Sequence, residues 1–163
     1  ETGPLFFVTN STANIHLSGV EVTAASGTLV QAGATERWGV SGANGGTVNL
    51  TADAQTLAGD LVADSISSLN ITLTNSASLA GAINADGAAQ SAALTLDASS
   101  VWTVTADSIL STLSDTDGIE GTNIVNIVGN GHTVYYDASL EANQALGGLT
   151  YTLVNGGELK PLN

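Results

Sequence analysis

The sequence contains no cysteine and no methionine, and only two of its 163 residues, Arg37 and Lys160, are basic. The absence of cysteine excludes a site built on thiolate ligands, although it is weak evidence of cellular compartment. Fifteen carboxylates against two basic side chains give a formal net charge of −13. Such a surface repels phosphate backbones and anionic lipids, so we expect no nucleic-acid partner. No apolar run approaches the roughly 18 residues of a membrane span, so we expect no membrane insertion.

The composition nevertheless predicts a folded protein of a single domain. Hydrophobic residues make up 43 % of the chain, which is enough for a sizeable core. Ser, Thr, Asn, Gly and Ala dominate, a combination that resembles exported bacterial surface proteins, so we expect a secreted or cell-surface location. A start methionine is missing, and Glu-Thr-Gly at 1–3 is typical of a vector scar, which leaves 4–163 as the domain.

A short pattern recurs about every 22 to 23 residues, most clearly over 48–107. Its landmarks fall into three series: Leu50, Leu73 and Leu96; Leu57, Leu79 and Trp102; and Asp64, Asp86 and Asp107. Within each unit apolar and polar residues alternate, as they do in strands with one buried face. No segment shows sustained helical periodicity, and 106–115 and 139–146 are the only short helical candidates.

These patterns predict an all-β fold. A sandwich also uses short strands and frequent turns. A repeat of constant length is better explained by a right-handed parallel β-helix, a solenoid in which each coil buries its face on the next. We therefore predict a single β-helix of about seven coils.

A resemblance to a group of known proteins rests on four stretches: LFFVTNSTANIHLSGVEV, RWGVSGANGGTVNLTADAQTLAGDLVADSISSLNITLTNSASLAGAI, LTLDASSVWTVTADS and GNGHTVYYD. They are similar to uncharacterised exported bacterial proteins with pectate-lyase-like right-handed parallel β-helices, found as adhesin-like or autotransporter-like repeat regions. This resemblance implies a fold and a surface location, because the group has no established activity.

The recurring aspartates are the first candidates for chemistry. Polysaccharide hydrolases need paired carboxylates, one of which stays protonated. Asp64, Asp86 and Asp107 each end a repeat unit, however, where aspartate more often caps a turn. Polysaccharide lyases usually need a basic residue, and Arg37 lies beside Glu36 as a ready ion pair. We therefore expect no enzymatic activity, with a carbohydrate-active protein that uses the acidic columns as the alternative.

The most distinctive local pattern is SDTDGIEG, at 114–121. Asp115, Asp117 and Glu120 surround Gly118 in a way that resembles the opening of a calcium loop. The full spacing to a distant glutamate is missing. The segment is thus a candidate calcium site, and an acidic surface turn is the simpler interpretation.

The few aromatic residues supply the candidate ligand-binding side chains. Trp102 occupies the register of Leu57 and Leu79, which predicts a core position. Trp38 and Tyr136 are the residues that we expect to stack on a sugar ring if they are exposed.

Together these observations predict a non-enzymatic, exported structural or adhesive module. Glycans or surface proteins of a host or the environment are its expected partners. The unpaired strand edges at the two ends of a solenoid also favour a homodimer formed end to end.

Overall fold

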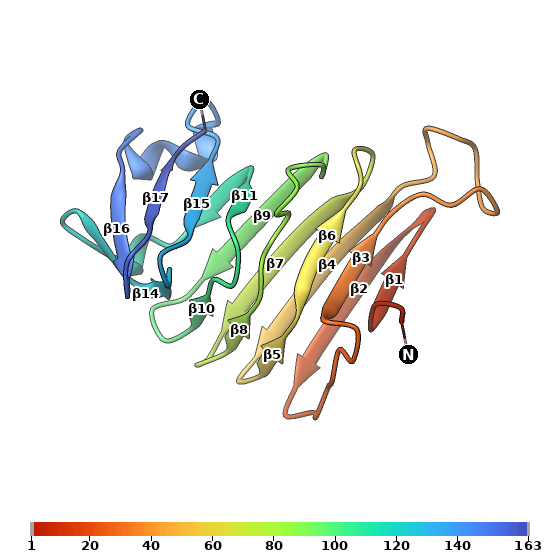
Figure 1. Ribbon diagram of the computed structural model, residues 1–163, viewed down its shortest axis with the longest axis horizontal. Helices are drawn as coiled ribbons and strands as arrows, with labels where there is room; N and C mark the ends of the chain where they lie inside the picture. Colours follow the sequence, from red (N-terminus) through yellow and green to blue (C-terminus); the bar gives the residue numbers. More distant parts are fainter. Residues whose placement is uncertain (1, 163) are drawn as a thin grey trace.

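The computed structural model describes residues 2–162, and most of them lie in short strands, as an all-β fold requires (Figure 1). The helical segments of the described residues are short 3-10 helices, η1 (Thr116–Gly118) and η2 (Glu141–Leu146). The helical candidate at 106–115 instead forms β11 (Ser108–Leu110) and β12 (Thr112–Ser114). Within the described part of the chain, no helix is long and apolar enough to cross a membrane.

The strands form three separate sheets of unequal size. The five-stranded sheet is wholly parallel and has the order β12, β9 (Ser91–Leu96), β7 (Ser68–Thr74), β4 (Gly46–Asp53) and β2 (Ser11–Ser18). The three-stranded sheet, also parallel, consists of β1 (Phe6–Val8), β3 (Thr28–Ala32) and β6 (Asp60–Ala63).

The third sheet has nine strands and is curled: the chain of pairings turns at β17, which joins β15 on one side to β16 on the other. One side continues through β15 and β11, and the other through β16, β14, β10, β8 and β5. The bounds are β5 (Thr56–Ala58), β8 (Ser78–Ala80), β10 (Val101–Thr103), β13 (Ile119–Glu120), β14 (Asn123–Val128), β15 (Thr133–Tyr136), β16 (Tyr151–Val154) and β17 (Glu158–Pro161).

The prediction of a single right-handed parallel β-helix of about seven coils with 22–23-residue repeats is wrong. The nine-stranded sheet is mixed, because β13 pairs antiparallel with β14, and β16 pairs antiparallel with β17. No strand among the described residues extends the five-stranded sheet beyond β12. At the other end of that sheet, β2 and β4 pair with an offset of 35 residues, well outside the repeat. The regular repeat is therefore a local feature of the middle of the chain.

The register of the five-stranded sheet also differs from the predicted one. Leu50 lies opposite Ile71 and Leu94, whereas Leu73 and Leu96 lie opposite Ala52. The predicted leucine series is thus displaced by two residues in β4. A shift of two keeps the same side chains on the inner face, so alternation alone does not distinguish the two registers. The series Leu57, Leu79 and Trp102 is confirmed by direct pairing in the nine-stranded sheet.

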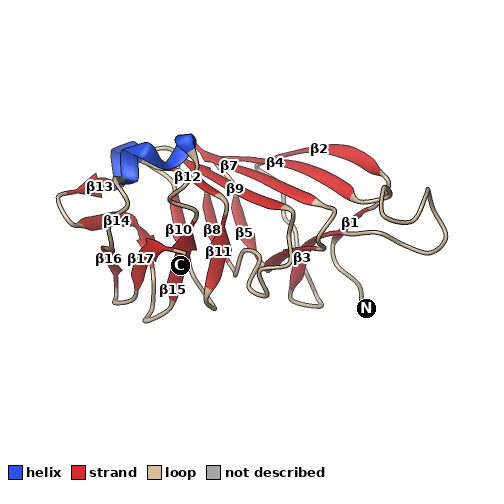
Figure 2. Ribbon diagram, turned by 90° about the horizontal axis from the view of Figure 1, so that it is seen from above, coloured by secondary structure: helices blue, strands red, loops and turns tan. Residues whose placement is uncertain are grey.

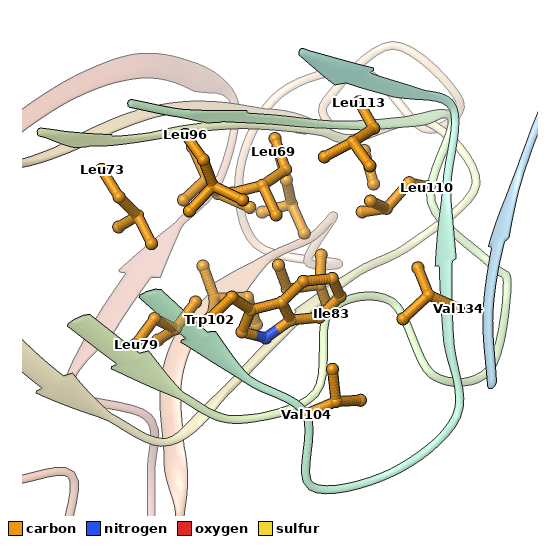
Figure 3. Packing of buried hydrophobic residues seen from close by; sticks show 14 of the residues in the cluster. Leu69, Leu73, Leu79, Ile83, Leu96, Trp102, Val104, Leu110, Leu113 and Val134 are labelled. Atoms are coloured by element: carbon orange, nitrogen blue, oxygen red, sulfur yellow. The ribbon is translucent and has the colours of Figure 1, made fainter. Parts of the chain in front are cut away.

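The inner faces of the three sheets enclose one apolar core. Alternation places Val48, Leu50 and Ala52 of β4 inside, and each is almost completely buried. Trp102 lies in this core among side chains from the five-stranded and nine-stranded sheets and from their connections, including Leu79 and Ile83 (Figure 3). Its indole Nε1 donates a 2.9 Å hydrogen bond to the carbonyl oxygen of Gly81, so the one polar atom of the side chain is satisfied.

The outer face of the five-stranded sheet is polar and includes a ladder of asparagine side chains. Asn70 Nδ2 donates to Asn49 Oδ1 over 2.9 Å, and Asn49 Nδ2 donates to Asn14 Oδ1 over 2.8 Å. The next outward row contains Thr51, Thr72 and Thr95. Cross-strand pairs of this kind reinforce the parallel pairing of β2, β4 and β7.

The β12 edge of the five-stranded sheet is covered by η2 (Figure 2). Asn143 of η2 is buried; its Oδ1 accepts from the Leu113 amide at 2.9 Å, and its Nδ2 donates to the Ser111 carbonyl at 2.8 Å. The side chain thereby replaces the next strand at this edge, and the backbone groups that it contacts are not left unpaired.

Replacing Asn143 by alanine should lower the free energy of unfolding by about 2–3 kcal/mol, because it leaves buried backbone groups of β12 without partners. Chemical denaturation of both proteins would measure the difference. Glu141→Ala, an exposed change in the same 3-10 turn, is the control and should alter stability little. A neutral Asn143→Ala variant would show that η2 does not cap the sheet.

Candidate functional site

The connection between β3 and β4, residues 33–45, projects from the N-terminal end of the molecule and is called the Trp38 loop below (Figure 1). Trp38 is 63 % exposed, and Val40 on the same loop is 74 % exposed. Because the other tryptophan, Trp102, is fully buried, Trp38 offers the largest aromatic surface to solvent. Of the two aromatic candidates chosen from the sequence, Trp38 is therefore the accessible one.

Hydrogen bonds hold the Trp38 loop in place although it contains no regular strand. Buried Asn44 donates through Nδ2 to the carbonyl oxygens of Thr35 and Trp38, both at 2.7 Å. Thr35 and Trp38 also form an isolated antiparallel bridge. At the start of the loop, Asp64 Oδ2 accepts from the Ala34 amide at 2.7 Å. The indole is thus presented on a braced turn, which reduces the ordering cost of binding.

Two shallow cavities adjoin the loop and share Ala34. The first, of about 330 Å³, is lined by Gln31, Ala32, Gly33, Ala34, Val62, Ala63, Asp64, Asp86 and Ala88. The second, of about 380 Å³, is lined by Ala34, Thr35, Glu36, Gly39, Ser41, Gly42 and Asn44. Amide, hydroxyl and carboxylate groups predominate among the polar lining, and no basic side chain lines either cavity.

The second cavity contains two residues with unpaired buried oxygens. Thr35 Oγ1 and Asn44 Oδ1 are both buried without a hydrogen-bond partner among the described residues. Buried polar atoms in native proteins are nearly always paired, so each exception needs an explanation. Both residues line the second cavity, which is formed by other residues of the Trp38 loop.

The aspartates of the predicted acidic series serve as turn caps. Asp64 accepts from the Ile66 amide as well as from Ala34, and Asp86 accepts from the Ala88 amide. Partial burial by itself raises the pKa of Asp64, but hydrogen bonds from Ala34, Ser67 and Ile66 outweigh it, and the net effect lowers that pKa. Asp64 is consequently an ionised structural acceptor.

The third member of that series lies elsewhere. Asp107 accepts from the Thr133 amide at 2.8 Å, and its Oδ1 is 3.7 Å from Nδ1 of His132. It lines neither of the two cavities beside the Trp38 loop. The structure therefore brings only Asp64 and Asp86 to a common cavity.

Tyr136, the other predicted stacking residue, belongs to the core. It has no exposed surface, and its hydroxyl donates a 2.8 Å hydrogen bond to the carbonyl oxygen of Leu149. Its neighbour Tyr135 faces the other way, as alternation in β15 requires, and is half-buried. The ammonium group of Lys160 lies 5.5 Å from the centre of the Tyr135 ring. Neither tyrosine presents a free aromatic face.

The predicted calcium loop contains one buried carboxylate and two exposed acidic residues. Asp115 is 1 % exposed, whereas Asp117 and Glu120 lie at the surface. Among residues 2–162 no group of three or more His, Cys, Asp or Glu side chains is arranged to hold a metal ion. The structure thus does not gather the three carboxylates around one point, and calcium binding stays a prediction.

The partner of Asp115 is Asn126 of β14. Asn126 Nδ2 donates to Asp115 Oδ1 at 2.8 Å, while Asp115 Oδ2 and Asn126 Oδ1 remain buried without partners. A side chain at Gly118 would collide with oxygens of both residues, so the glycine is required for this packing. Burial raises the pKa of Asp115 to about 6, and nearby Asp117 adds to the rise, while the bonds from Asn126 and Gly118 oppose it.

Sequence reasoning missed Asn44 and Asn126, the residues that organise the Trp38 loop and the Asp115 pair. Asparagine is common in this chain, and neither residue occurs in a recognisable motif. The one sequence feature that marks Asn44 is the glycine pair that follows it; the structure shows that added Cβ atoms at Gly45 and Gly46 would collide with the backbone of Ile66 and Val8. Comparison of the chain with protein-family models, curated proteins and solved structures gives no match, so no relative assigns a role to any of these residues.

Proposed function

We propose that this protein is a non-enzymatic adhesive module that binds carbohydrate through the Trp38 loop and the two cavities beside it. The single observation that carries the proposal is the exposure of Trp38 on a loop braced by buried Asn44. Flat aromatic faces stack on the apolar faces of sugar rings, and the ring has only two side-chain torsions to fix on binding.

The polar lining of the cavities supports the same ligand class. Sugar hydroxyls donate and accept hydrogen bonds, and the amide, hydroxyl and carboxylate groups of the cavity linings provide partners for them. The absence of basic side chains from the lining, together with Asp64, Asp86 and Glu36, disfavours acidic polysaccharides. Neutral glycans are therefore the expected ligands, and a secreted or cell-surface location is part of the proposal.

The geometry of the acidic residues favours binding over catalysis. Glycoside hydrolysis requires one carboxyl group that stays protonated near neutral pH. Asp64, in the cavity, instead has a lowered pKa because backbone and side-chain donors stabilise its charge. A carbohydrate-active protein remains the alternative, and it predicts the release of reducing ends from a polysaccharide together with loss of that activity in Asp86→Asn.

Replacing Trp38 by alanine should weaken binding to the retained polysaccharide at least tenfold, equivalent to about 1.4 kcal/mol, because it removes the stacking surface. Affinity gel electrophoresis with cellulose derivatives, mannan and soluble chitin fragments would identify the retained polysaccharide. Isothermal titration with its oligosaccharides would then give the change in affinity. The melting temperature should stay within a few degrees of the wild type, because the side chain is largely exposed.

Val40→Ala is the matched control, since Val40 is an exposed apolar side chain on the same loop. It should leave affinity within about twofold of the wild-type value. Equal retention of the wild-type and Trp38→Ala proteins would contradict the proposed site, and reducing-end release would contradict the non-enzymatic part of the proposal.

A further inference from the structure

The two edge strands of the five-stranded sheet, β12 and β2, differ in whether their outward-pointing backbone groups are paired. At β12 the buried Asn143 of η2 occupies the edge, as described above. At β2 no backbone hydrogen bond among residues 2–162 reaches the side of the strand that faces away from β4. Figure 1 shows β2 at the N-terminal end of the molecule, where the short strand β1 and the Trp38 loop lie farther out but neither pairs with it. The sheet therefore has one capped edge and one open edge.

The open edge lacks the features by which proteins prevent unwanted strand pairing. β2 has eight residues and is therefore as long as β4, the strand with which it pairs. Its sequence, STANIHLS, contains no proline, lysine, arginine, aspartate or glutamate, and its pairing with β4 has no bulge. Long, regular and uncharged edges of this kind act as templates for another strand.

The inner face of β2 is also incompletely covered. Ala13, Ile15 and Leu17 are only partly buried, whereas the residues opposite them in β4 are 1 % exposed or less. The apolar layer thus continues to the edge, where it meets solvent. A further strand at this position would remove apolar surface from water as well as pair the backbone.

The distribution of charge shows which partner this edge suits. Glu21 is the only carboxylate between residues 2 and 35, whereas twelve of the fifteen in the chain follow residue 52. A molecule with a net charge of −13 repels its own copies over most of its surface, and the repulsion is weakest at this end. The asparagine ladder ends here too, at Asn14, whose Oδ1 accepts from Asn49.

We propose that two copies of this chain associate through the open edge of β2. A twofold axis pairs the two β2 strands antiparallel and joins the two five-stranded sheets into one sheet of ten strands. In this arrangement the same residues face each other from both copies, as a twofold interface requires. Ile15 and Leu17 become covered, and each Asn14 meets the edge of the other copy. The dimer presents two Trp38 loops, but the contact does not depend on carbohydrate binding.

Sedimentation velocity over a wide range of protein concentrations tests the dimer. We expect a concentration-dependent shift from 16.2 kDa to twice that mass, and stronger association at high salt, which screens the net charge. Ile15→Lys should weaken association at least tenfold, because it places a charge at the centre of the edge. Thr72→Lys, on the outer face of the central strand β7, makes the same change in charge away from the edge and should leave the dimer intact.

Hydrogen exchange on the wild-type protein provides a second readout in case Ile15→Lys fails to fold. The amides of β2 that point away from β4 should be protected in the dimer and lose protection on dilution, while those of β7 should not change. A single 16.2 kDa species at every concentration would overturn the proposal. A dimer in which the β2 amides exchange as fast as in the monomer, or one that survives folded Ile15→Lys unchanged, would also overturn it.

Discussion

The Asp115→Asn variant is expected to be more stable than the wild-type protein at pH 7, by about 3 kcal/mol, and to lose this advantage below pH 4. Burial raises the pKa of Asp115 from 3.8 to about 6, and one pKa unit corresponds to about 1.36 kcal/mol. Above pH 6 the native protein must therefore hold an ionised carboxylate in a buried position. An asparagine carries no charge at any of these pH values.

The hydrogen bonds at Asp115 point to the same result. Asn126 Oδ1 and Asp115 Oδ2 are acceptors without donors in the ionised state. A proton on Asp115, or the amide group of an asparagine at this position, supplies a donor beside Gly118, where oxygens of both residues converge. The existing bond from Asn126 Nδ2 to Oδ1 stays in place.

The direction of the pH dependence follows from proton linkage. Between pH 3.8 and about 6 the unfolded state has lost the Asp115 proton and the native state retains it, so wild-type stability falls as the pH rises through this window. Asp97 acts in a different window. Partial burial raises its pKa, but bonds from the Asn75 amide and from Ser99 lower it to about 2, so its stabilising effect is lost as the pH falls below 3.8.

Denaturation curves for both proteins at intervals from pH 3 to pH 8 would measure this difference. The wild-type curve should have its maximum near pH 4, and the difference between the two proteins should grow between pH 4 and pH 6 and then level off. A constant difference across the range would contradict a raised pKa. An increase in the melting temperature with millimolar calcium, present in the wild type and absent in Asp115→Asn, would instead support the calcium interpretation.

Replacing Trp102 by alanine should destabilise the protein by about 3–5 kcal/mol, the second large effect. The ring is completely buried between the sheets, and Figure 3 shows it among leucine, isoleucine and valine side chains. These side chains are held by their own strands, so we expect them to fill only part of the cavity that the substitution leaves. The substitution also removes the donor to the Gly81 carbonyl oxygen. Chemical denaturation at pH 7 would measure the loss.

Trp102→Phe separates packing from the hydrogen bond, because it keeps most of the aromatic volume and removes Nε1. It should destabilise the protein by about half as much as alanine or less. A Trp102→Ala variant with a loss below about 1 kcal/mol would mean that the ring is not a central part of the core.

The sequence predicts strand character and the inward side chains well, because alternation follows directly from strand geometry. Alternation places Val48 and Leu50, Ile71 and Leu73, and Leu94 and Leu96 on the inner face, and all six are buried. The register could not be derived in the same way, since a shift of two residues preserves the inner face. The mixed part of the nine-stranded sheet, which follows β12 in the chain, could not be predicted from the repeat. The 22- to 23-residue pattern does not continue there, and two of the strand pairs are antiparallel.

The candidate site could be predicted only in part. Trp38 was a candidate because few aromatic residues are present. Its exposure depends on the conformation of its loop, which is held by hydrogen bonds from Asn44 to residues six and nine positions earlier, and no sequence motif indicates these bonds. Tyr136 and Tyr135 could not be ordered into inner and outer positions until the register of β15 was known. The turn-capping role of Asp64 and Asp86 followed from their position at the ends of repeat units and is confirmed.

Acrylamide quenching of tryptophan fluorescence tests the proposed binding site most directly. The chain has two tryptophans; Trp102 is fully buried and Trp38 is 63 % exposed, so almost all quenching in the free protein should come from Trp38. We predict that saturating amounts of the retained oligosaccharide will protect the fluorescence from acrylamide, and that the protection will be absent in Trp38→Ala. Binding that leaves the quenching of the wild-type protein unchanged would contradict the account.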